Sequence, residues 1–414
     1  MPQCEHYHIC HRNGGEGAQP NLCILHSQFP VKDAQAFATA FDTHRKERGD
    51  NFTAFVFPEK FSFSEKPFPS DVNFSGATFS ANATFLETTF SKGANFDRAT
   101  FNRKAFFDRA TFSEATFSAE VDFIRMTFGE RANFDRATFK NRASFYEVTF
   151  REGADFSGTT FDVEAFFRQA RFKGRTSFSG ERAKFIFCGA TIDFSDITLE
   201  PLEALILRDV DLQHCHFLNT DLRKAEITGA KWPQAGGRAV VYDEIASRQE
   251  GKFPPWSRLE RLYRELKQNY EDRRDYERAG DFHYGEKEMR RKNAHTSSSL
   301  RFLLTLYWAA SGYGERYLRP LAWAIALFVI ATVLYLRLGL KGEWTGGAKP
   351  TLSMANVGDW LQAAHYSFRV MTFLKPEQVA TPISYSRVVH TVQSILSPLF
   401  LGLFALAVRQ RLKR

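Results

Sequence analysis

Cysteine is scarce in this chain, with five residues among 414, an odd number with no paired spacing. This composition excludes the disulfide-stapled folds of small secreted proteins. The first 25 residues also lack the apolar stretch of a secretory signal peptide. We therefore expect the soluble part of the chain to be cytoplasmic and its thiols to be reduced.

The motifs of common enzyme classes are missing as well. The sequence holds no nucleophile paired with a base, no glycine-rich phosphate loop and no convergent carboxylates outside a repeated surface pattern. His283 and Tyr284 are neighbours, but no nucleophile or second base accompanies them. We predict a non-enzymatic protein without catalytic residues.

Phenylalanine, in contrast, is abundant, with 43 residues against 13 tyrosines and 6 tryptophans. Twenty phenylalanines recur at steps of mostly five and six residues, and alanine stands two places before fourteen of them. The series is Phe79, Phe85, Phe90, Phe96, Phe101, Phe107, Phe112, Phe117, Phe123, Phe128, Phe134, Phe139, Phe145, Phe150, Phe156, Phe161, Phe167, Phe172, Phe178 and Phe185. One side chain placed so regularly indicates a structural repeat of about eleven residues.

We interpret the unit Ala-(Thr/Asn/Asp)-Phe-x-x as one short extended side of a coil, followed by a corner. Alternate residues of an extended chain share a face, so the phenylalanine and the small residue two places before it point inward. Stacked coils pair their backbones about 4.8 Å apart, and about eight or nine of them would form a rod of roughly 40 Å.

A right-handed supercoiled helix also has an eleven-residue apolar period. The segment is rich in Thr, Phe, Asn, Ser and Gly, however, which are mediocre to poor helix formers. After Leu207 the step is strictly five, which is not a helical period. The inward positions there are Leu207, Leu212, Phe217, Leu222, Ile227 and Trp232, and Cys215 fills one of the small inward slots between them.

The segments VDLQH, CHFLN and TDLRK resemble the A(D/N)LXX repeats of the pentapeptide-repeat family, and ATFSE and ANFDR resemble its Phe-centred variant. The resemblance covers residues 51–232 and implies a right-handed quadrilateral β-helix. The frequent six-residue step departs from the family pattern and predicts insertions or bulges at the corners. Some family members imitate DNA with acidic rods. From Phe74 to Trp232, however, 21 Lys and Arg balance 22 Asp and Glu, so we expect no nucleic-acid-related function.

Residues 1–50 hold three of the five cysteines, in the spacing C-x5-C-x12-C-x2-H formed by Cys4, Cys10, Cys23 and His26. A closed set of thiolates and imidazole is typical of structural zinc sites. The alternatives are a disordered terminus with unrelated thiols, or a ligand set in which His6, His8 or His11 takes part. We predict a structural zinc ion, followed by one helix over 31–49 that caps the solenoid.

The repeat ends at a predicted linker, 233–255. The pattern of residues 256–299 predicts a basic helical hairpin with its turn at Ala279 and Gly280. Three basic residues close this segment, namely Arg290, Arg291 and Lys292. They precede the apolar segments directly, and we expect them to contact anionic lipid headgroups.

Residues 300–414 form a predicted membrane region. Two apolar segments, at about 318–338 and 388–408, are long enough to span a bilayer, whereas 300–310 is half a span and is expected at the interface. Lys and Arg gather before the first span and after the second, which places both ends of the chain in the cytoplasm.

The segment 358–374 between the two spans is predicted to dip back into the membrane as a short helix. Span, short helix and span is the plan of two-helix potassium channels, and AAHYSFRVMTF resembles their pore helix. The filter sequence of that family is missing after Thr372 and Phe373. Arg369 in this segment would repel cations if it faced a pore.

Two functions follow from these features. The first is a membrane-anchored scaffold whose solenoid binds an unknown cytoplasmic protein. The second is a homo-oligomeric channel, or a sensor derived from one, with a degenerate filter gated by the solenoid. The combination of repeats, basic segment and two spans resembles a group of bacterial membrane proteins, which implies a multi-pass protein of the bacterial inner membrane.

Overall fold

The computed structural model describes residues 3–12, 22–27, 33–58, 61–63, 67–79, 88–90, 92–101, 112, 115–128, 131–180, 187, 189–249, 255–341, 356–374, 380–383 and 385–412. The chain divides into two compact units, Met1–Arg273 and Arg274–Arg414. Each unit is described by itself below.

The first unit begins with the short helix α1 (Tyr7–Cys10) and the helix α2 (Ala34–Arg48). The carboxylate of Asp33 accepts hydrogen bonds from the first free backbone N–H groups of α2. Gly49, at a φ of 78°, ends the helix. The predicted helix over 31–49 is therefore confirmed over Ala34–Arg48. Phe41 of α2 stacks on Phe52, at 4.8 Å between ring centroids, and so covers the first coil of the solenoid.

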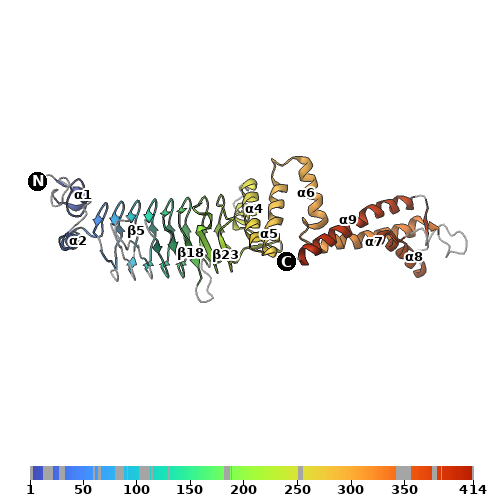
Figure 1. The fold of residues 1–414 in the computed structure, drawn as a ribbon, viewed down its shortest axis with the longest axis horizontal. Coiled ribbons are helices and arrows are strands. Elements are labelled where there is room, and N and C mark those ends of the chain that lie inside the picture. Colours follow the sequence, from blue (N-terminus) through green and yellow to red (C-terminus); the bar gives the residue numbers. More distant parts are fainter. Residues whose placement is uncertain are drawn as a thin grey trace. The chain divides into compact units, whose positions relative to one another are not determined.

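The solenoid consists of four parallel sheets that the chain visits in turn (Figure 1). We name each sheet after its first strand. The β1 sheet contains β1 (Val56–Phe57), β3 (Thr78–Phe79), β6 (Thr100–Phe101), β9 (Thr127–Phe128), β13 (Thr149–Phe150), β17 (Arg171–Phe172) and β20 (Thr198–Leu199). The β2 sheet contains β2 (Val72–Asn73), β5 (Ala94–Asn95), β8 (Val121–Asp122), β12 (Ala143–Ser144), β16 (Glu164–Phe166), β19 (Thr191–Asp193) and β22 (Cys215–His216).

The other two sheets are shorter. The β4 sheet contains β4 (Thr89–Phe90), β7 (Thr116–Phe117), β11 (Thr138–Phe139) and β15 (Thr160–Phe161). The β10 sheet contains β10 (Ala132–Asn133), β14 (Ala154–Asp155), β18 (Thr176–Ser179), β21 (Leu205–Arg208) and β23 (Glu226–Thr228), and the 3-10 helix η1 (Leu202–Ala204) precedes β21. Because all four sheets are parallel, each coil stacks in register on the one before it.

The register explains the mixture of five- and six-residue steps. Thr138 pairs with Thr160, so one coil takes 22 residues, which equals two steps of five and two of six. In the strictly five-residue region Leu207 pairs with Ile227, and the coil shortens to 20 residues. Six-residue steps thus lengthen alternate corners without shifting the side chains that face inward.

The two kinds of corner differ in their local chemistry. At a five-residue corner the carbonyl of Phe134 accepts a hydrogen bond from the N–H of Ala137, and Arg136 between them has a φ of 53°. The side chain of Asn133 accepts a hydrogen bond from the N–H of Asp135, 2.9 Å away. Asn or Asp before the phenylalanine therefore favours the tight corner, whereas Thr, as in Thr138, precedes the six-residue corner.

The inward positions form a continuous stack of aromatic rings. Phe134 lies parallel to Phe156 with 4.7 Å between centroids, and Phe117 lies parallel to Phe139 at 4.8 Å. Ala132, two places before Phe134, is fully buried. The predicted inward register is confirmed for the phenylalanines of the series whose burial is described, all of which are buried. Three phenylalanines of the series lie outside the described residues, namely Phe85, Phe107 and Phe185.

The predicted linker 233–255 is in part folded, which corrects the sequence interpretation. Its described residues form the antiparallel hairpin β24 (Gln234–Ala235) and β25 (Arg238–Ala239) and the helix α3 (Tyr242–Gln249). Gly236 and Gly237, both at positive φ, make the turn of the hairpin. The glycines that suggested a linker therefore serve a tight turn.

The helix α4 (Trp256–Asp272) covers the last coil of the solenoid. The side-chain amide of Asn269 donates to the carbonyls of Leu222 and Ala225, at 2.6 and 2.7 Å. Trp232, at the end of the repeat, donates through its indole N–H to the hydroxyl of Tyr270, 2.8 Å away. Carbonyl groups that a further coil would have bound are thus satisfied by a helix.

The second unit is helical, and it contains α5 (Tyr276–Lys292), α6 (Ser298–Ser311), α7 (Leu318–Leu338), α8 (Val357–Thr372) and α9 (Ser386–Leu412). A short antiparallel pair, β26 (Leu340–Lys341) and β27 (Thr381–Pro382), follows α7 and precedes α9. The predicted turn at Ala279 and Gly280 is wrong. Both residues are buried inside α5, where the small side chains allow close packing, and the break after α4 falls at Arg273 to Asp275.

Two helices, α7 and α9, are long and apolar enough to cross a membrane. Only 28% of the most apolar window of α7 and 17% of that of α9 is buried. Most of the apolar surface of both helices is therefore exposed within the chain. Their bounds agree with the predicted spans, and α8 packs against both.

Candidate functional site

Three cysteines and one histidine come together at the N-terminal end of the solenoid. Cys4 precedes α1 and Cys10 is its last residue, and the N–H of Cys10 donates to the carbonyl of His6. Cys23 and His26 lie in a second turn, in which the N–H of His26 donates to the carbonyl of Cys23. All four residues are buried. The sequence prediction of this set is therefore confirmed as a spatial cluster.

The geometry of the cluster fits a tetrahedral metal ion. Its four potential ligand atoms lie within 4.8 Å of one another. The Sγ atoms of Cys23 and Cys10 are 3.6 Å apart, and Nδ1 of His26 lies 3.3 Å from Sγ of Cys23 and 3.7 Å from Sγ of Cys4. A tetrahedral zinc ion separates two thiolates by about 3.8 Å and a thiolate from an imidazole nitrogen by about 3.6 Å. The four residues could therefore hold such an ion with little movement.

The second ring nitrogen of His26 is oriented by the protein. Its Nε2 lies 3.3 Å from the carbonyl oxygen of Thr53, which leaves Nδ1 to face the thiols. A hydrogen bond of this kind is the usual support of a metal-binding histidine. His6 stacks on His26 at 4.5 Å between centroids, but within the described residues the close group contains only the three cysteines and His26.

The thiols also influence one another electrostatically. The hydrogen bond between Cys23 and Cys10, together with burial, raises the pKa of Cys23 to about 12. Burial likewise raises the pKa of Cys4. Buried thiols of this kind ionise when a cation replaces their protons, so that metal binding would release protons.

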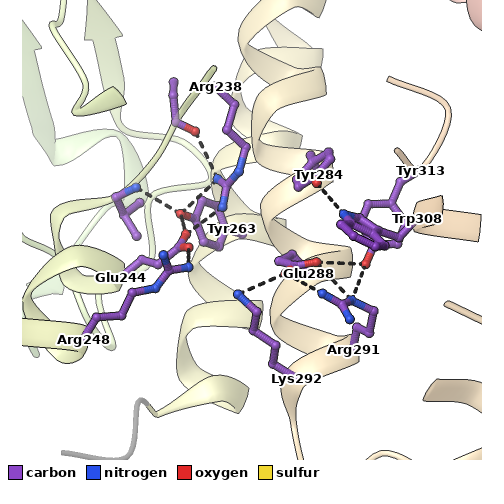
Figure 2. Close-up of polar contacts among 12 residues, drawn as sticks. Arg238, Glu244, Arg248, Tyr263, Tyr284, Glu288, Arg291, Lys292, Trp308 and Tyr313 are labelled. Carbon is purple, nitrogen blue, oxygen red and sulfur yellow. Dashed lines mark hydrogen bonds and ion pairs between the residues drawn. The ribbon is translucent and has the colours of Figure 1, made fainter. Parts of the chain in front are cut away.

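A second buried cluster joins the end of the solenoid to α4 (Figure 2). The guanidinium of Arg238 donates to Glu244 at 2.8 Å, and Arg248 and the hydroxyl of Tyr263 bond to the same carboxylate. Burial would lower the pKa of Arg238, but Tyr263 and Glu244 outweigh burial and raise it. The cluster is fully paired, and we assign it a structural role between α3 and α4.

A third cluster, in the second unit, contains two of the basic residues predicted to contact lipid (Figure 2). Arg291 and Lys292 bind the carboxylate of Glu288, at 2.8 and 3.0 Å, and the hydroxyl of Tyr313 donates to the same carboxylate. Burial raises the pKa of Glu288, but the hydrogen bonds from Arg291 and Lys292 outweigh it and lower the pKa. Arg291 and Lys292 are therefore engaged within the protein, and Arg290 is half-buried beside them.

An indole group connects this cluster to the helices that follow. The guanidinium groups of Arg291 and Arg319 lie 5.0 and 5.2 Å from the ring centroid of Trp308. The indole N–H of Trp308 donates to the hydroxyl of Tyr284 at 2.8 Å. Contacts of a cation with an aromatic face are stabilising where water is excluded. Trp308 thus links α5, α6 and the start of α7.

The pore-like residues all lie at the C-terminal end of α8. Arg369 donates through Nε to the carbonyl of Leu374 at 2.6 Å, and the hydroxyl of Thr372 donates to the carbonyl of Phe368 at 2.8 Å. Phe373, at a φ of 58°, ends the helix and is 64% exposed. Arg369 and Thr372 thus serve local hydrogen bonds that terminate α8.

Sequence reasoning missed a buried polar group among α7, α8 and α9. Gln393 of α9 accepts from the hydroxyl of Tyr335 at 3.0 Å and donates to Oγ of Ser367 at 2.8 Å. In the same bundle the hydroxyl of Tyr366 lies 2.9 Å from Nδ1 of His390. A single amide in an otherwise apolar run was the available signal, since a polar group in such a segment needs a hydrogen-bond partner within the protein.

Comparison with known protein families agrees with the architecture of the first unit. A family model of pentapeptide repeats in nine copies matches residues 134–182, and a model of eight copies matches residues 206–231. The chain carries pentapeptide repeats. Neither the curated proteins nor the solved structures contain a significant match to it.

The pentapeptide repeats present a surface of paired charges. Ion pairs join side chains of adjacent coils, as between Arg125 and Glu147 at 3.0 Å and between Arg131 and Asp155 at 2.9 Å. An open groove of about 600 Å³ follows one corner of the β1 sheet, and Arg125, Glu147, Gln169, Arg171 and Asp196 are among the residues that line it. Such a surface offers polar and charged groups of both signs.

Proposed function

We propose that this protein is a membrane-anchored pentapeptide-repeat scaffold without enzymatic activity, whose solenoid binds a cytoplasmic protein partner. As the family resemblance implies, its four sheets would form a right-handed quadrilateral coil. Two features of the same chain support the proposal. One is a long solenoid with charges of both signs on its surface, and the other is two apolar helices whose surfaces are left uncovered.

The balance of charge on the solenoid surface favours a protein partner over a nucleic acid. Its ion pairs, such as the one between Arg168 and Asp196 at 3.5 Å, balance charge along the coils. Recognition of a phosphate backbone requires an excess of positive charge, and its imitation requires an excess of negative charge. The mixed groove along the β1 sheet, with the exposed side chain of Arg171, suits a partner of mixed polarity.

Exposed apolar side chains support membrane anchoring. Ile325 and Ile330 of α7 are 54% and 56% exposed, and Ile395 of α9 is 65% exposed. A soluble protein rarely leaves faces of this kind uncovered. The helix α6 exposes Phe302 by 67% and fits the predicted interfacial helix. We propose an inner bacterial membrane, with both chain ends in the cytoplasm and Arg290 near the lipid headgroups.

The polar groups of the bundle favour an anchor over a conducting pore. Gln393, Ser367 and Tyr335 bond to one another inside one chain, so they do not face a passage between chains. A pore lined by several copies of this chain would need polar groups on the exposed faces of the helices of each copy. We therefore expect a protein that does not conduct ions.

We also propose that Cys4, Cys10, Cys23 and His26 hold a structural zinc ion. The donor set of three thiols and one imidazole suits zinc, and the ligand positions are all filled by the protein, as in structural sites. When bound, the ion would supply the stability that a terminal segment of this size lacks by itself.

Carbonate extraction of membranes and ion flux in proteoliposomes test the proposal together. We expect the full-length protein to stay in the membrane pellet after alkaline carbonate, and proteoliposomes to show no flux above that of protein-free vesicles. Release into the soluble fraction would contradict anchoring. A flux that is abolished by substitution of Thr372 would instead establish the channel.

A further inference from the structure

Within the described residues, the first coil of the solenoid begins at an edge that no strand covers. β1 is the terminal strand of its sheet there, and its described strand partner is β3. The N–H of Val56 points away from that neighbour and donates to the carbonyl of Leu25, 2.8 Å away. Leu25 lies between Cys23 and His26 and is fully buried. The turn that carries two of the potential metal ligands therefore takes the place of a strand on the open edge of β1.

A second contact joins the cluster to the same coil. Nε2 of His26 lies 3.3 Å from the carbonyl oxygen of Thr53, three residues before Val56. The ring of Phe55 meets His26 edge-on at 5.0 Å between centroids, and it meets His44 of α2 at the same distance. One potential ligand thus contacts the first coil with both its polar and its aromatic surface.

We propose that metal bound by Cys4, Cys10, Cys23 and His26 locks this turn as a cap over the edge of β1, and that loss of the metal uncovers the edge for pairing with a second copy of the chain. The inference rests on the metal site proposed above. Residues 3–12 and 22–27 bury few apolar side chains of their own, so the ion is what would hold the turn in shape.

The fold restricts what the uncovered edge can bind. The opposite end of the solenoid is closed by α4, where Asn269 and Arg273 occupy the carbonyls of the last coil. Two copies that pair through the uncovered edge would then meet head to head, through the same edge in both, which gives a closed dimer rather than a filament. An exposed strand edge is a ready template for such pairing.

The test uses full-length protein in detergent, with and without a zinc chelator, and compares three readouts. Zinc content reports occupancy, hydrogen exchange of the Val56 amide reports the cap, and light scattering on a sizing column reports the protein mass. With zinc we expect a protected amide. After chelation we expect exchange about 100-fold faster and a doubling of the protein mass. Cys23→Ser should reproduce the chelated state.

Cys215→Ser is the matched control, because it changes a buried thiol of the solenoid that lies outside the cluster. It should keep zinc, the protected amide and the original mass. If zinc is removed while the amide stays protected or the mass stays constant, the cap inference is wrong although the zinc site stands. If the purified protein binds no zinc and the amide is still protected, both proposals are wrong. Growth into species larger than dimers would overturn the head-to-head pairing.

Discussion

The side-chain amide nitrogen of Asn269 lies 2.7 Å from the carbonyl oxygen of Ala225 and 2.6 Å from that of Leu222. One residue of α4 therefore satisfies two carbonyls at the end of the pentapeptide repeats. The contact explains how the repeats can stop at Trp232 while these two carbonyls still accept hydrogen bonds. It also joins α4 to the solenoid within the first compact unit.

Asn269→Ala should lower the free energy of unfolding by about 1–3 kcal/mol, because it removes two buried hydrogen bonds, to the carbonyls of Leu222 and Ala225. Denaturant titration of the full-length protein in detergent, followed by circular dichroism, measures the loss. Gln268→Ala is the matched control, since Gln268 is the exposed neighbour in the same helix and should have little effect. Equal losses in both variants would show that the capping bonds do not stabilise the solenoid.

Ala132→Leu should overpack the inward slot beside Phe134 and cost about 1–3 kcal/mol of stability. Ala132 is fully buried, whereas the side chain of its neighbour Arg131 is 54% exposed and pairs with Asp155 at the surface. Arg131→Leu should therefore cost no more than about 1 kcal/mol. The same denaturant titration compares the two variants, and similar costs would contradict the inward register.

The purified protein should contain one zinc ion per chain, and Cys23→Ser should lose it. Cys23 lies within hydrogen-bonding distance of both Cys10 and His26, so its thiol is central to the cluster. Metal analysis of protein prepared without added zinc measures the content. Retention of full zinc by Cys23→Ser would point to a different ligand set, in which His6 takes part.

Gln393→Leu should destabilise the helical unit by about 0.6–2 kcal/mol, because Tyr335 and Ser367 lose a buried partner within the bundle. Thermal unfolding in detergent measures the effect. Thr391→Val is the control, since Thr391 is exposed on the same helix and bonds only to the carbonyl of Arg387. An unchanged transition in Gln393→Leu would show that α8 is held by apolar packing alone.

The stability of the second unit should fall in acid because of Glu288. The pKa of this carboxyl group is lowered in the fold, below its ordinary value of 4.5. A lowered pKa means that the stabilisation is complete above the unfolded pKa and is lost as the pH falls through the folded pKa. Glu288→Gln should cost about 1–3 kcal/mol at pH 7, and the difference from wild type should shrink below pH 4.5. Thermal unfolding at several pH values tests this, and a difference that does not change with pH would contradict the role of the charge.

The sequence predicted the inward register of the repeats because each phenylalanine, such as Phe134, depends only on neighbours at a fixed spacing. It also predicted the approximate bounds of α7 and α9, since a long apolar run is a property of one continuous segment. It failed at Ala279 and Gly280, whose small side chains suggested a turn. Burial inside α5 offsets the helix cost of glycine there, and burial depends on partners distant in the chain.

The sequence by itself thus determined the repeat, the two apolar spans and the candidate metal ligands, because each is encoded in local spacing. Only the tertiary structure showed that Cys4 and Cys10 meet Cys23 and His26, that Asn269 closes the solenoid, and that Gln393 binds Ser367. These contacts join residues 13 to 47 positions apart in the chain. Their geometry depends on how whole elements pack, which no local pattern specifies.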